Sequence, residues 1–387
     1  WGSLYWSVTL IYRVCSHHFS CQMPPDPNRP TKIFITAGDP SGDAHAARLM
    51  AEIRKRIPDV VFEGFGGPAM ELEGLRSLAH IRDLAVTGFW EVAKRYRFFR
   101  DLMKRCERAI ERSRPVLFIP VDYPGFNMRL AAKVRSHRLR VAWYIAPQLW
   151  AWGEKRAKGL AAAVDRLLVV FPFEVEFFSR HGIRAEYVGH PLSESIDPVY
   201  APTRSATEVL LMPGSRKQEV LHHSPLLAET INRLQRTRPD LTFVVAQARN
   251  VDLQALKPLI DVGATISTNA ERSMATATAG LIKAGTSTLE AAMRGLPFAT
   301  YYRTSMLTYE VSKRLVNVTS VTMMNLLLNR PVIHEYIQGD ATAKNLELEV
   351  IDLVSNVDRR MELTQAMNEV RSLLSGGGAS ANAATII

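Results

Sequence analysis

The sequence predicts an α/β protein built from two Rossmann-like domains. Short apolar segments rich in β-branched residues alternate with segments of helical periodicity along most of the chain. This alternation is typical of parallel sheets flanked by helices. It is interrupted once, near residues 196–205, where closely spaced proline, threonine and serine indicate a linker. Two such series joined by a linker predict two domains that face each other across a cleft, the usual place for ligands in such folds.

The expected strands follow the two series in order. In the first series they cover residues 32–36, 60–65, 115–121, 140–145, 166–170 and 185–188. In the second series they cover residues 208–212, 242–246, 280–283 and 298–302. Helices are expected at residues 44–56, before Pro58, and at 289–294, where Gly295 and Pro297 follow. Most of the last third of the chain is expected to be helical.

These elements predict four segments: a leader at 1–30, a first domain at 31–200, a second domain at 201–360 and a helical tail at 361–387. The leader differs from the rest in composition, since it holds two of the three cysteines and ends in a proline-rich stretch. We expect translation to begin at Met23, with the residues before it non-native or without fixed structure.

Composition limits the possible functions. The chain has 387 residues, 47% of them apolar and 22% charged, which excludes a disordered protein. Its net charge of +10 favours an anionic partner, which could be nucleic acid, a phosphorylated substrate or a membrane surface. Three cysteines are too few for a disulfide framework, and neither they nor the histidines have the spacing of metal ligands. No apolar run reaches the roughly 20 residues of a membrane span.

The first candidate site is the glycine-bearing turn after the first strand, Gly38-Asp39-Pro40-Ser41-Gly42-Asp43. Glycine allows a tight turn and a close approach to a ligand, and the following helix offers unpaired amides. Two acids in the turn favour recognition of hydroxyl groups over phosphate. The alternative is an ordinary turn in which Asp43 caps the helix.

The second candidate is Asp122, which ends a strand. A carboxylate at the carboxyl end of a strand, facing a cleft, can act as a general base. The alternative is a capping aspartate for the helix that begins near Pro124. Spacing alone leaves both interpretations open.

Two turns of the second series suit a nucleotide diphosphate. Gly214-Ser215-Arg216 offers a helix amino end and an arginine, although a surface arginine on an ordinary turn is the alternative. Residues 285–290, GTSTLE, place hydroxyls and Glu290 at another helix start. Glu290 could accept hydrogen bonds from ribose hydroxyls, or it could form a capping box with Ser287.

The segment from Trp90 to Arg114 is basic and aromatic, with nine basic residues against four acids. Such a helix can lie in an anionic bilayer interface. A nucleic-acid surface is one alternative, and a solvated helix whose rings pack on the sheet is another. The residues proposed for the membrane interface are Phe89, Trp90, Tyr96, Arg97, Phe98, Phe99 and Arg100.

From about residue 31 to the end, the order of motifs resembles lipid-A-disaccharide synthase, a family of inverting glycosyltransferases of the GT-B type. The motifs are AGDPSGD (37–43), GGPAM (66–70), LAVTGFWEV (84–92), VDYPGFN (121–127), YIAPQLWAW (144–152), FPFE (171–174), VGHPL (188–192), LMPGSRKQEV (211–220), GTSTLEAA (285–292) and the segment 324–338. The resemblance implies transfer of 2,3-diacylglucosamine from UDP-2,3-diacylglucosamine to 2,3-diacylglucosamine 1-phosphate (lipid X), without a metal or other cofactor.

The resemblance also assigns roles to residues. Asp122 becomes the general base on the acceptor hydroxyl, and Arg216 stabilises the departing diphosphate. The donor-side positions are Gly214, Ser215, Arg216, Gly285, Thr286, Ser287, Thr288, Glu290 and Asn325. The acceptor-side positions are Gly38, Asp39, Ser41, Gly42, Asp43, Asn127 and Gln148. Two positions depart from the family: Asp39 stands where glutamate is frequent, and Gly125 where some members carry a second aspartate.

The partners implied are the two lipid substrates and the inner-membrane surface, with no nucleic acid. The protein is expected in the cytoplasm, peripheral on the inner face of the inner membrane. The C-terminal helices either pack back on the chain or exchange between the protomers of a homodimer. The alternatives are another UDP-sugar transferase or an epimerase of the same fold, and, from another class, a basic membrane-peripheral or nucleic-acid-binding protein.

Overall fold

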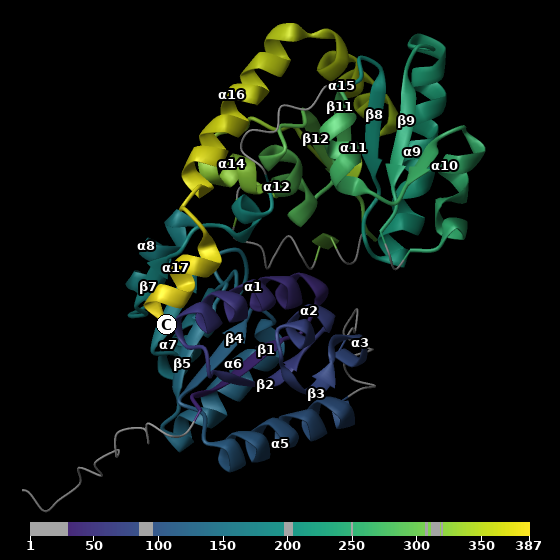
Figure 1. Ribbon diagram of the computed structural model, residues 1–387. Coiled ribbons are helices and arrows are strands. Elements are labelled where there is room, and N and C mark those ends of the chain that lie inside the picture. The colour runs from purple at the N-terminus through teal and green to yellow at the C-terminus, as the bar shows by residue number, and fades with distance from the viewer. Residues whose placement is uncertain are drawn as a thin grey trace, which may run out of the picture.

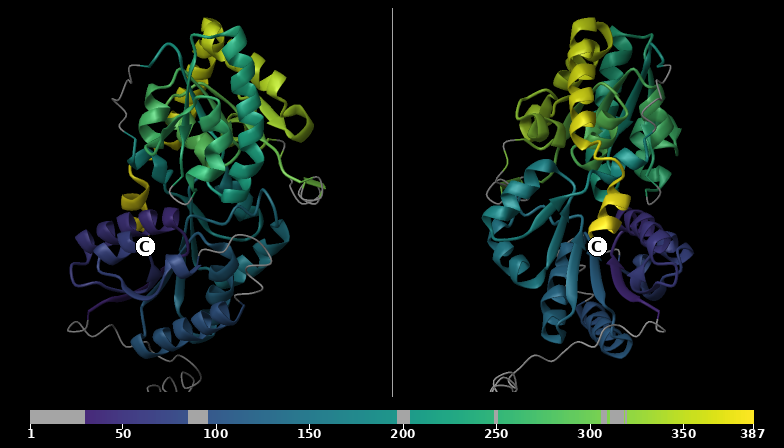
Figure 2. Two further views of the ribbon diagram at one scale, coloured as in Figure 1. Left: turned by 90° about the vertical axis from the view of Figure 1, so that its right-hand side faces the viewer. Right: turned by 60° about the vertical axis from the view of Figure 1, so that its left-hand side comes forward.

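A computed structural model describes residues 30–84, 96–196, 204–248, 251–305, 309–310, 318 and 320–387. The molecule has two lobes, and each is a parallel sheet flanked by helices (Figure 1). The lobes are joined near a waist, which the two further views also show (Figure 2). The predicted fold class, two Rossmann-like α/β units, is therefore confirmed.

The first lobe is built on a seven-stranded sheet in the order β3-β2-β1-β4-β5-β6-β7, with every neighbouring pair parallel. The strands are β1 (Lys32–Ala37), β2 (Val61–Gly66), β3 (Arg76–His80), β4 (Leu117–Val121), β5 (Arg140–Tyr144), β6 (Arg166–Val169) and β7 (Ala185–Tyr187). The central strands are almost continuously apolar because helices cover both faces. The order reverses between β1 and β4, and α/β sheets bind ligands at such a switch point.

Helices cover this sheet on both faces. They are α1 (Pro40–Arg56), α2 (Pro68–Leu72), α3 (Ile81–Leu84), α5 (Tyr96–Ser113), α6 (Pro124–Val134), α7 (Ala157–Ala163) and α8 (Pro172–Arg180), with the 3-10 turns η1 (Arg135–His137), η2 (Glu154–Arg156) and η3 (Pro191–Glu194). Helix α5 is strongly amphipathic. It buries Leu102, Cys106 and Ile110, which share one face at helical spacing, while most of its basic residues are exposed.

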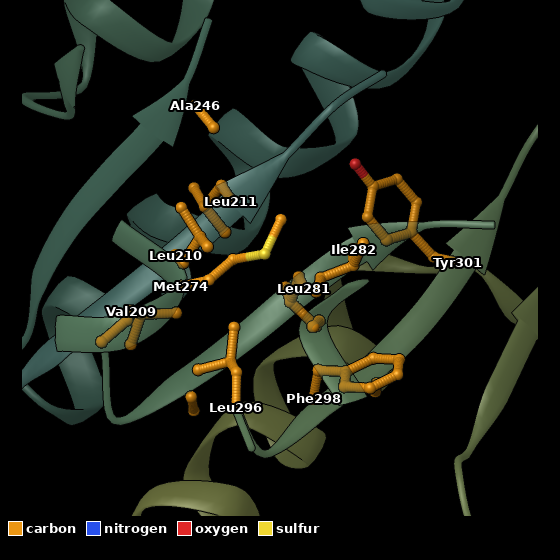
Figure 3. Close-up of a cluster of buried hydrophobic side chains, with 14 of the residues drawn as sticks. Val209, Leu210, Leu211, Ala246, Met274, Leu281, Ile282, Leu296, Phe298 and Tyr301 are labelled. Atoms are coloured by element: carbon orange, nitrogen blue, oxygen red, sulfur yellow. The ribbon is translucent and has the colours of Figure 1, made fainter. Parts of the chain in front are cut away.

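The second lobe is built on a six-stranded parallel sheet in the order β10-β9-β8-β11-β12-β13. Its strands are β8 (Glu208–Met212), β9 (Thr242–Ala246), β10 (Thr265–Ser267), β11 (Ala279–Lys283), β12 (Phe298–Tyr302) and β13 (Glu335–Ile337). Figure 3 shows how the side chains of β8, β11 and β12 form its core together with Met274 and Leu296. The edge strands β3, β10 and β13 are absent from the sequence prediction because none of them contains a continuous apolar run, and none has a fully buried residue.

The remaining helices surround the second sheet. They are α9 (Lys217–Thr237), α10 (Lys257–Asp261), α11 (Ala270–Thr276), α12 (Thr286–Met293), α14 (Met323–Leu328) and α15 (Ala343–Ser355), with η4 (Leu253–Leu256) and η5 (Gln338–Asp340). Across the described residues, no helix combines the length and apolar character needed to cross a membrane.

The chain returns to the first lobe at its end. Helix α16 (Val357–Leu374) packs on α12 and α14, and α17 (Ala379–Ile386) then packs on α1 (Figures 1 and 2). The amide and hydroxyl of Ser380 both donate to the carboxylate of Glu194, at 2.5 and 2.9 Å. Between the two helices, Gly376 passes so close to Gly189 that a Cβ on Gly376 would lie 2.8 Å from the Gly189 Cα. This crossing therefore needs a residue without a side chain.

Candidate active site

Two predicted turns meet at the carboxyl ends of β1 and β4, which are neighbours in the first sheet. The ring of Tyr123 lies against the backbone of Gly38, where an added Cβ would be 2.2 Å from a ring carbon. Glycine at position 38 is thus required by this close approach. The 38–43 turn and the turn at Asp122 and Tyr123 therefore form one site.

The backbone at Asp122 and Tyr123 is strained. Both residues have left-handed conformations, with φ of 44° and 50°, which cost roughly 1–3 kcal/mol each for residues other than glycine. Asn127 holds this turn in place: its amide nitrogen donates to the Asp122 carbonyl at 2.8 Å, and its amide oxygen accepts from the Thr36 hydroxyl at 2.9 Å. The amide of Asn127 is therefore used in positioning Asp122.

The carboxylate of Asp122 has the properties of a general base. Burial, reinforced by the negative charge of Asp39, raises its pKa to about 7. A base works best when its pKa lies near the operating pH. The residue at the N-cap of α6 is Tyr123, with no side-chain cap bond, so the alternative in which Asp122 caps this helix is not what the structure shows.

The two aspartates of the first turn have different tasks. Asp39 caps α1 by accepting a hydrogen bond from the amide of Gly42 at 2.7 Å. Asp43 is buried and caps α2 instead, accepting from the amides of Gly67, Ala69 and Met70 at 2.8–3.0 Å. The interpretation that Asp43 caps its own helix is therefore wrong, because three amides at the start of α2 converge on its carboxylate.

Ser41 and Gln148 are the predicted acceptor-side residues with exposed polar side chains. Ser41 lies in the first turn of α1, 3.2 Å from Nε2 of His45. Gln148 lies in the loop after β5, which reaches the same edge of the sheet. Both could contact a polar ligand there.

Glu174 supports this loop and was not among the predicted site residues. Its buried carboxylate accepts hydrogen bonds from Nε1 of Trp150 and from the amides of Val170 and Phe171, at 2.9–3.2 Å. Burial raises its pKa to about 7, against the effect of these donors. Glu174 thus ties the loop after β5 to the end of β6, and the FPFE motif was the available signal.

The second site is a pocket of about 400 Å³ at the ends of β8 and β11. Seven of the predicted donor-side residues line it: Gly214, Ser215, Arg216, Gly285, Thr286, Ser287 and Glu290. Gly214 and Gly285 have φ of 130° and 150°, conformations that residues with a side chain rarely adopt. Both turns lead directly into helices, α9 and α12, whose first amides have no partner within the helix.

The start of α12 leaves Glu290 available to a ligand. The N-cap of α12 is Gly285, without a side-chain cap bond, so the capping box between Ser287 and Glu290 does not form. Glu290 instead lies 3.7 Å from the guanidinium of Arg294, one turn further along. Burial raises the pKa of Glu290, and the charge of Arg294 opposes this rise.

Thr288 and Asn325 are buried and do not line this pocket. The Thr288 hydroxyl donates to the Gly285 carbonyl at 2.7 Å. The Asn325 amide bonds to the backbone of Val332 and Ile333 and to Glu335, at 2.8–3.0 Å. In this structure their polar atoms hold neighbouring turns together.

Lys283 lines the pocket and was missed by the sequence analysis. Its ammonium lies 3.2 Å from Oε1 of Glu219, which is also 3.1 Å from the guanidinium of Arg216. Burial works against ionisation of Glu219, but the two cations outweigh it and hold the pKa of this carboxyl below its usual value. Two cations that line the pocket, Arg216 and Lys283, therefore share the carboxylate of Glu219. Lys283 could have been found from its position at a strand end, two residues before Gly285.

Two buried side chains hold the turn after β8 in place. Nδ1 of the buried His223 lies 2.7 Å from the Pro213 carbonyl, and its Nε2 accepts from the amide of Arg303 at 3.1 Å. The Tyr301 hydroxyl donates to the Met212 carbonyl at 3.0 Å. Buried groups thus fix the backbone on which Gly214 and Arg216 are carried.

The predicted membrane-interface residues fall into three groups. Phe89 and Trp90 lie outside the described residues. Tyr96, Arg97 and Arg100 are exposed at the start of α5. Phe98 and Phe99 are partly buried and pack against the core of the first lobe.

Among the described residues, no group of three or more His, Cys, Asp and Glu side chains is placed to hold a metal ion.

Comparison with known proteins gives a consistent result. The family model for lipid-A-disaccharide synthetase matches residues 33–385. A lipid-A-disaccharide synthase from Anaeromyxobacter sp. (strain K) is 35% identical over 366 residues, which cover 91% of this chain and 96% of the relative. One from Geobacter sulfurreducens is 33% identical over 373 residues, covering 93% of this chain and 97% of the relative.

Solved structures with the same fold are more distant in sequence. The UDP-GlcNAc 2-epimerase from Neisseria meningitidis bound to UDP-GlcNAc has a TM-score of 0.60 at 10% identity, covering 92% of this chain and 97% of that one. The glycotransferase of kitacinnamycin has a TM-score of 0.58 at 14% identity, covering 92% of this chain and 98% of that one. At such low identity the likeness concerns the fold alone.

Proposed function

The chain belongs to the lipid-A-disaccharide synthetase family, and we propose that its two sites hold UDP-2,3-diacylglucosamine and 2,3-diacylglucosamine 1-phosphate. Its activity is that of a glycosyltransferase in the synthesis of the lipid A disaccharide. Family membership favours this activity over an epimerase or a basic binding protein. The observation that carries the assignment of sites is the Asp122 carboxylate, which sits on a strained turn with a pKa of about 7.

On the acceptor side, Asp122 removes the proton from the attacking hydroxyl of the acceptor sugar. The hydroxyl oxygen forms a bond to C1 of the donor sugar while the bond from C1 to the diphosphate oxygen breaks. Attack opposite the leaving group inverts the configuration at C1. Asp122 is left protonated, and UDP leaves with the bonding electron pair. The fixed turn holds the base in place, which reduces the entropy lost on reaching the transition state.

On the donor side, the pocket at β8 and β11 binds UDP. Arg216, Lys283 and the first amides of α9 and α12 stabilise the negative charge that develops on the diphosphate. Glu290 accepts hydrogen bonds from ribose hydroxyls. Because these groups supply positive charge at the leaving group, we propose that transfer needs no metal ion.

The two lipid substrates also suggest where the protein works. We propose that it binds the cytoplasmic face of the inner membrane through the start of α5 and the segment before it. We further propose a homodimer in which the C-terminal helices exchange between protomers at the crossing near Gly376. The mass of a single chain in light scattering at micromolar protein concentration would contradict the dimer.

Purified protein should form the disaccharide and UDP from the two diacylated substrates in detergent, with a metal chelator present. The measurement follows UDP release and the mass of the disaccharide together. UDP-N-acetylglucosamine as the only donor provides a specificity control. Absence of product from a folded, UDP-binding protein would place the substrates elsewhere.

Asp122→Asn should lower kcat by about 10²–10⁴-fold and leave the Kd for UDP within about twofold, because it removes a base and changes little volume. In the wild type, kcat should rise with pH through about 7 as Asp122 loses its proton. The variant should lose this rise. Wild-type turnover in the variant would exclude Asp122 as the base.

Thermal unfolding provides the control for the Asp122 variant. The raised pKa means that the folded state binds this proton more tightly than the unfolded state, so ionisation lowers the free energy of unfolding as pH rises from about 4 to about 7. Asparagine carries no such charge. The variant should therefore unfold at the same or a higher temperature than the wild type above pH 7, which separates lost chemistry from lost structure.

Lys283→Met should raise the Kd for UDP about tenfold or more, since it removes a charge-assisted contact and leaves Glu219 less neutralised. Arg216→Ala should weaken both UDP binding and turnover. Lys257→Met is a matched control, because Lys257 also pairs with a carboxylate, Asp261, but lies outside the pocket. Titration calorimetry gives the three values. An unchanged Kd in the Lys283 variant would show that its ammonium does not reach the diphosphate.

Arg97→Ala with Arg100→Ala should reduce flotation with anionic vesicles, since each basic residue near such a surface contributes about 1 kcal/mol. The control removes two exposed charges of the second lobe, Arg236→Ala with Lys344→Ala. Equal flotation of both double variants would show that the start of α5 does not face the membrane.

A further inference from the structure

A mostly apolar groove of about 500 Å³ lies between α5 and α6, beside the turn that carries Asp122. Its apolar lining comes from Tyr96, Phe99 and Met103 of α5 and from Tyr123 and Phe126 at the start of α6. The Phe99 and Phe126 rings lie 6.4 Å apart, and Phe126 packs edge-on against Phe65 at 5.3 Å. These rings are therefore anchored in the core of the lobe and form a preformed wall.

Gly125 leaves open space at the edge of this groove. It lies in the first turn of α6 and lines the groove, and a Cβ added there would meet no heavy atom within 4 Å. Its backbone is not left-handed, so the conformation does not demand glycine. Glycine at this position leaves space in the groove near Tyr123, which directly follows Asp122 in the chain.

The rim of the groove is basic. Arg100, Lys104, Arg129 and Lys133 line it together with a single acid, Glu107. Glu107 is paired with Lys133 at 2.7 Å, and Arg100 lies 3.5 Å from its neighbour Asp101. Within the described part of the chain, Lys104 and Arg129 have no acidic partner. An apolar floor with unpaired cations at its edge is complementary to an amphiphile that carries an apolar chain and an anionic group.

We propose that this groove receives an acyl chain of the phosphorylated acceptor, with its phosphate near the basic rim. The inference rests on the proposed function and assigns to the acceptor a chain-binding site that the catalytic residues do not supply. The acceptor is the occupant because Tyr123 belongs both to the groove and to the turn of Asp122, the base that acts on the acceptor. The nucleotide pocket of the donor is in the other lobe.

The direct test fills the groove. Gly125→Leu places a branched side chain in the open space, and Gly159→Leu is the matched control, because Gly159 also lies in a helix with no heavy atom within 4 Å of an added Cβ. Each variant is assayed with acceptors that carry either tetradecanoyl or butanoyl chains. Burial of one methylene is worth about fourfold in binding, so loss of a few methylenes is readily measured.

For Gly125→Leu, kcat/KM for the tetradecanoyl acceptor should fall at least tenfold, while the value for the butanoyl acceptor stays within about twofold. Gly159→Leu should change neither value. An equal loss with both acceptors, or no loss with either, would overturn the proposal while the wild type still makes disaccharide. If the wild type used neither acceptor, the proposed function itself would fail, so the two failures are distinguishable.

Photo-crosslinking identifies the occupant. An acceptor with a diazirine at the end of one acyl chain should label peptides of α5 and α6, and excess unlabelled acceptor should suppress the labelling. Crosslinks found only in other elements would overturn the proposal. Suppression by phosphatidylglycerol but not by unlabelled acceptor would also overturn it, since the groove would then hold a membrane lipid.

Discussion

The left-handed turn at Asp122 and Tyr123 is the constraint on which the first site depends. A strained backbone persists only where its surroundings hold it, and here two contacts do so. The Tyr123 ring packs on Gly38, and Asn127 bonds to both the Asp122 carbonyl and Thr36. These contacts join the ends of β1 and β4. Asp122 thereby comes before the N-cap of α6, which is Tyr123, and its carboxylate is not used as the cap of that helix.

In the second lobe, the main constraint is the repulsion between two neighbouring positive charges. Arg216 and Lys283 lie close together although their charges repel. Glu219 lies between them and compensates for that repulsion, at 3.1 and 3.2 Å. In the donor site that we propose, a diphosphate offers more negative charge and more acceptor atoms than one carboxylate, so the cations can turn to it without a large rearrangement. His223 and Tyr301 hold the backbone of this turn in place.

The sequence predicted the alternation of strands and helices and most of the turns at the strand ends, because burial on both sheet faces and glycine in tight turns leave clear patterns. It did not predict β3, β10 or β13, which are edge strands without a continuous apolar run. It could not decide which helix Asp43 caps, since the amides of α2 are 24–27 residues away. It missed Lys283 because a lysine at the end of a strand resembles an ordinary solvated terminus. The sequence also could not show that the Asn325 amide forms hydrogen bonds with neighbouring residues, because these bonds depend on the three-dimensional structure.

The same limitation explains why the sequence did not predict the groove between α5 and α6. The pattern of α5 shows which residues face the core and which face water, but it says nothing of the space left beside a neighbouring helix. Gly125 lines that space, and cations border it, although the overall charge of +10 did not show where the basic residues gather. Under the proposed function, the amphipathic helix α5 serves two purposes. Its buried face stabilises the lobe, and its boundary between apolar and basic residues matches the boundary between chain and phosphate in a lipid substrate.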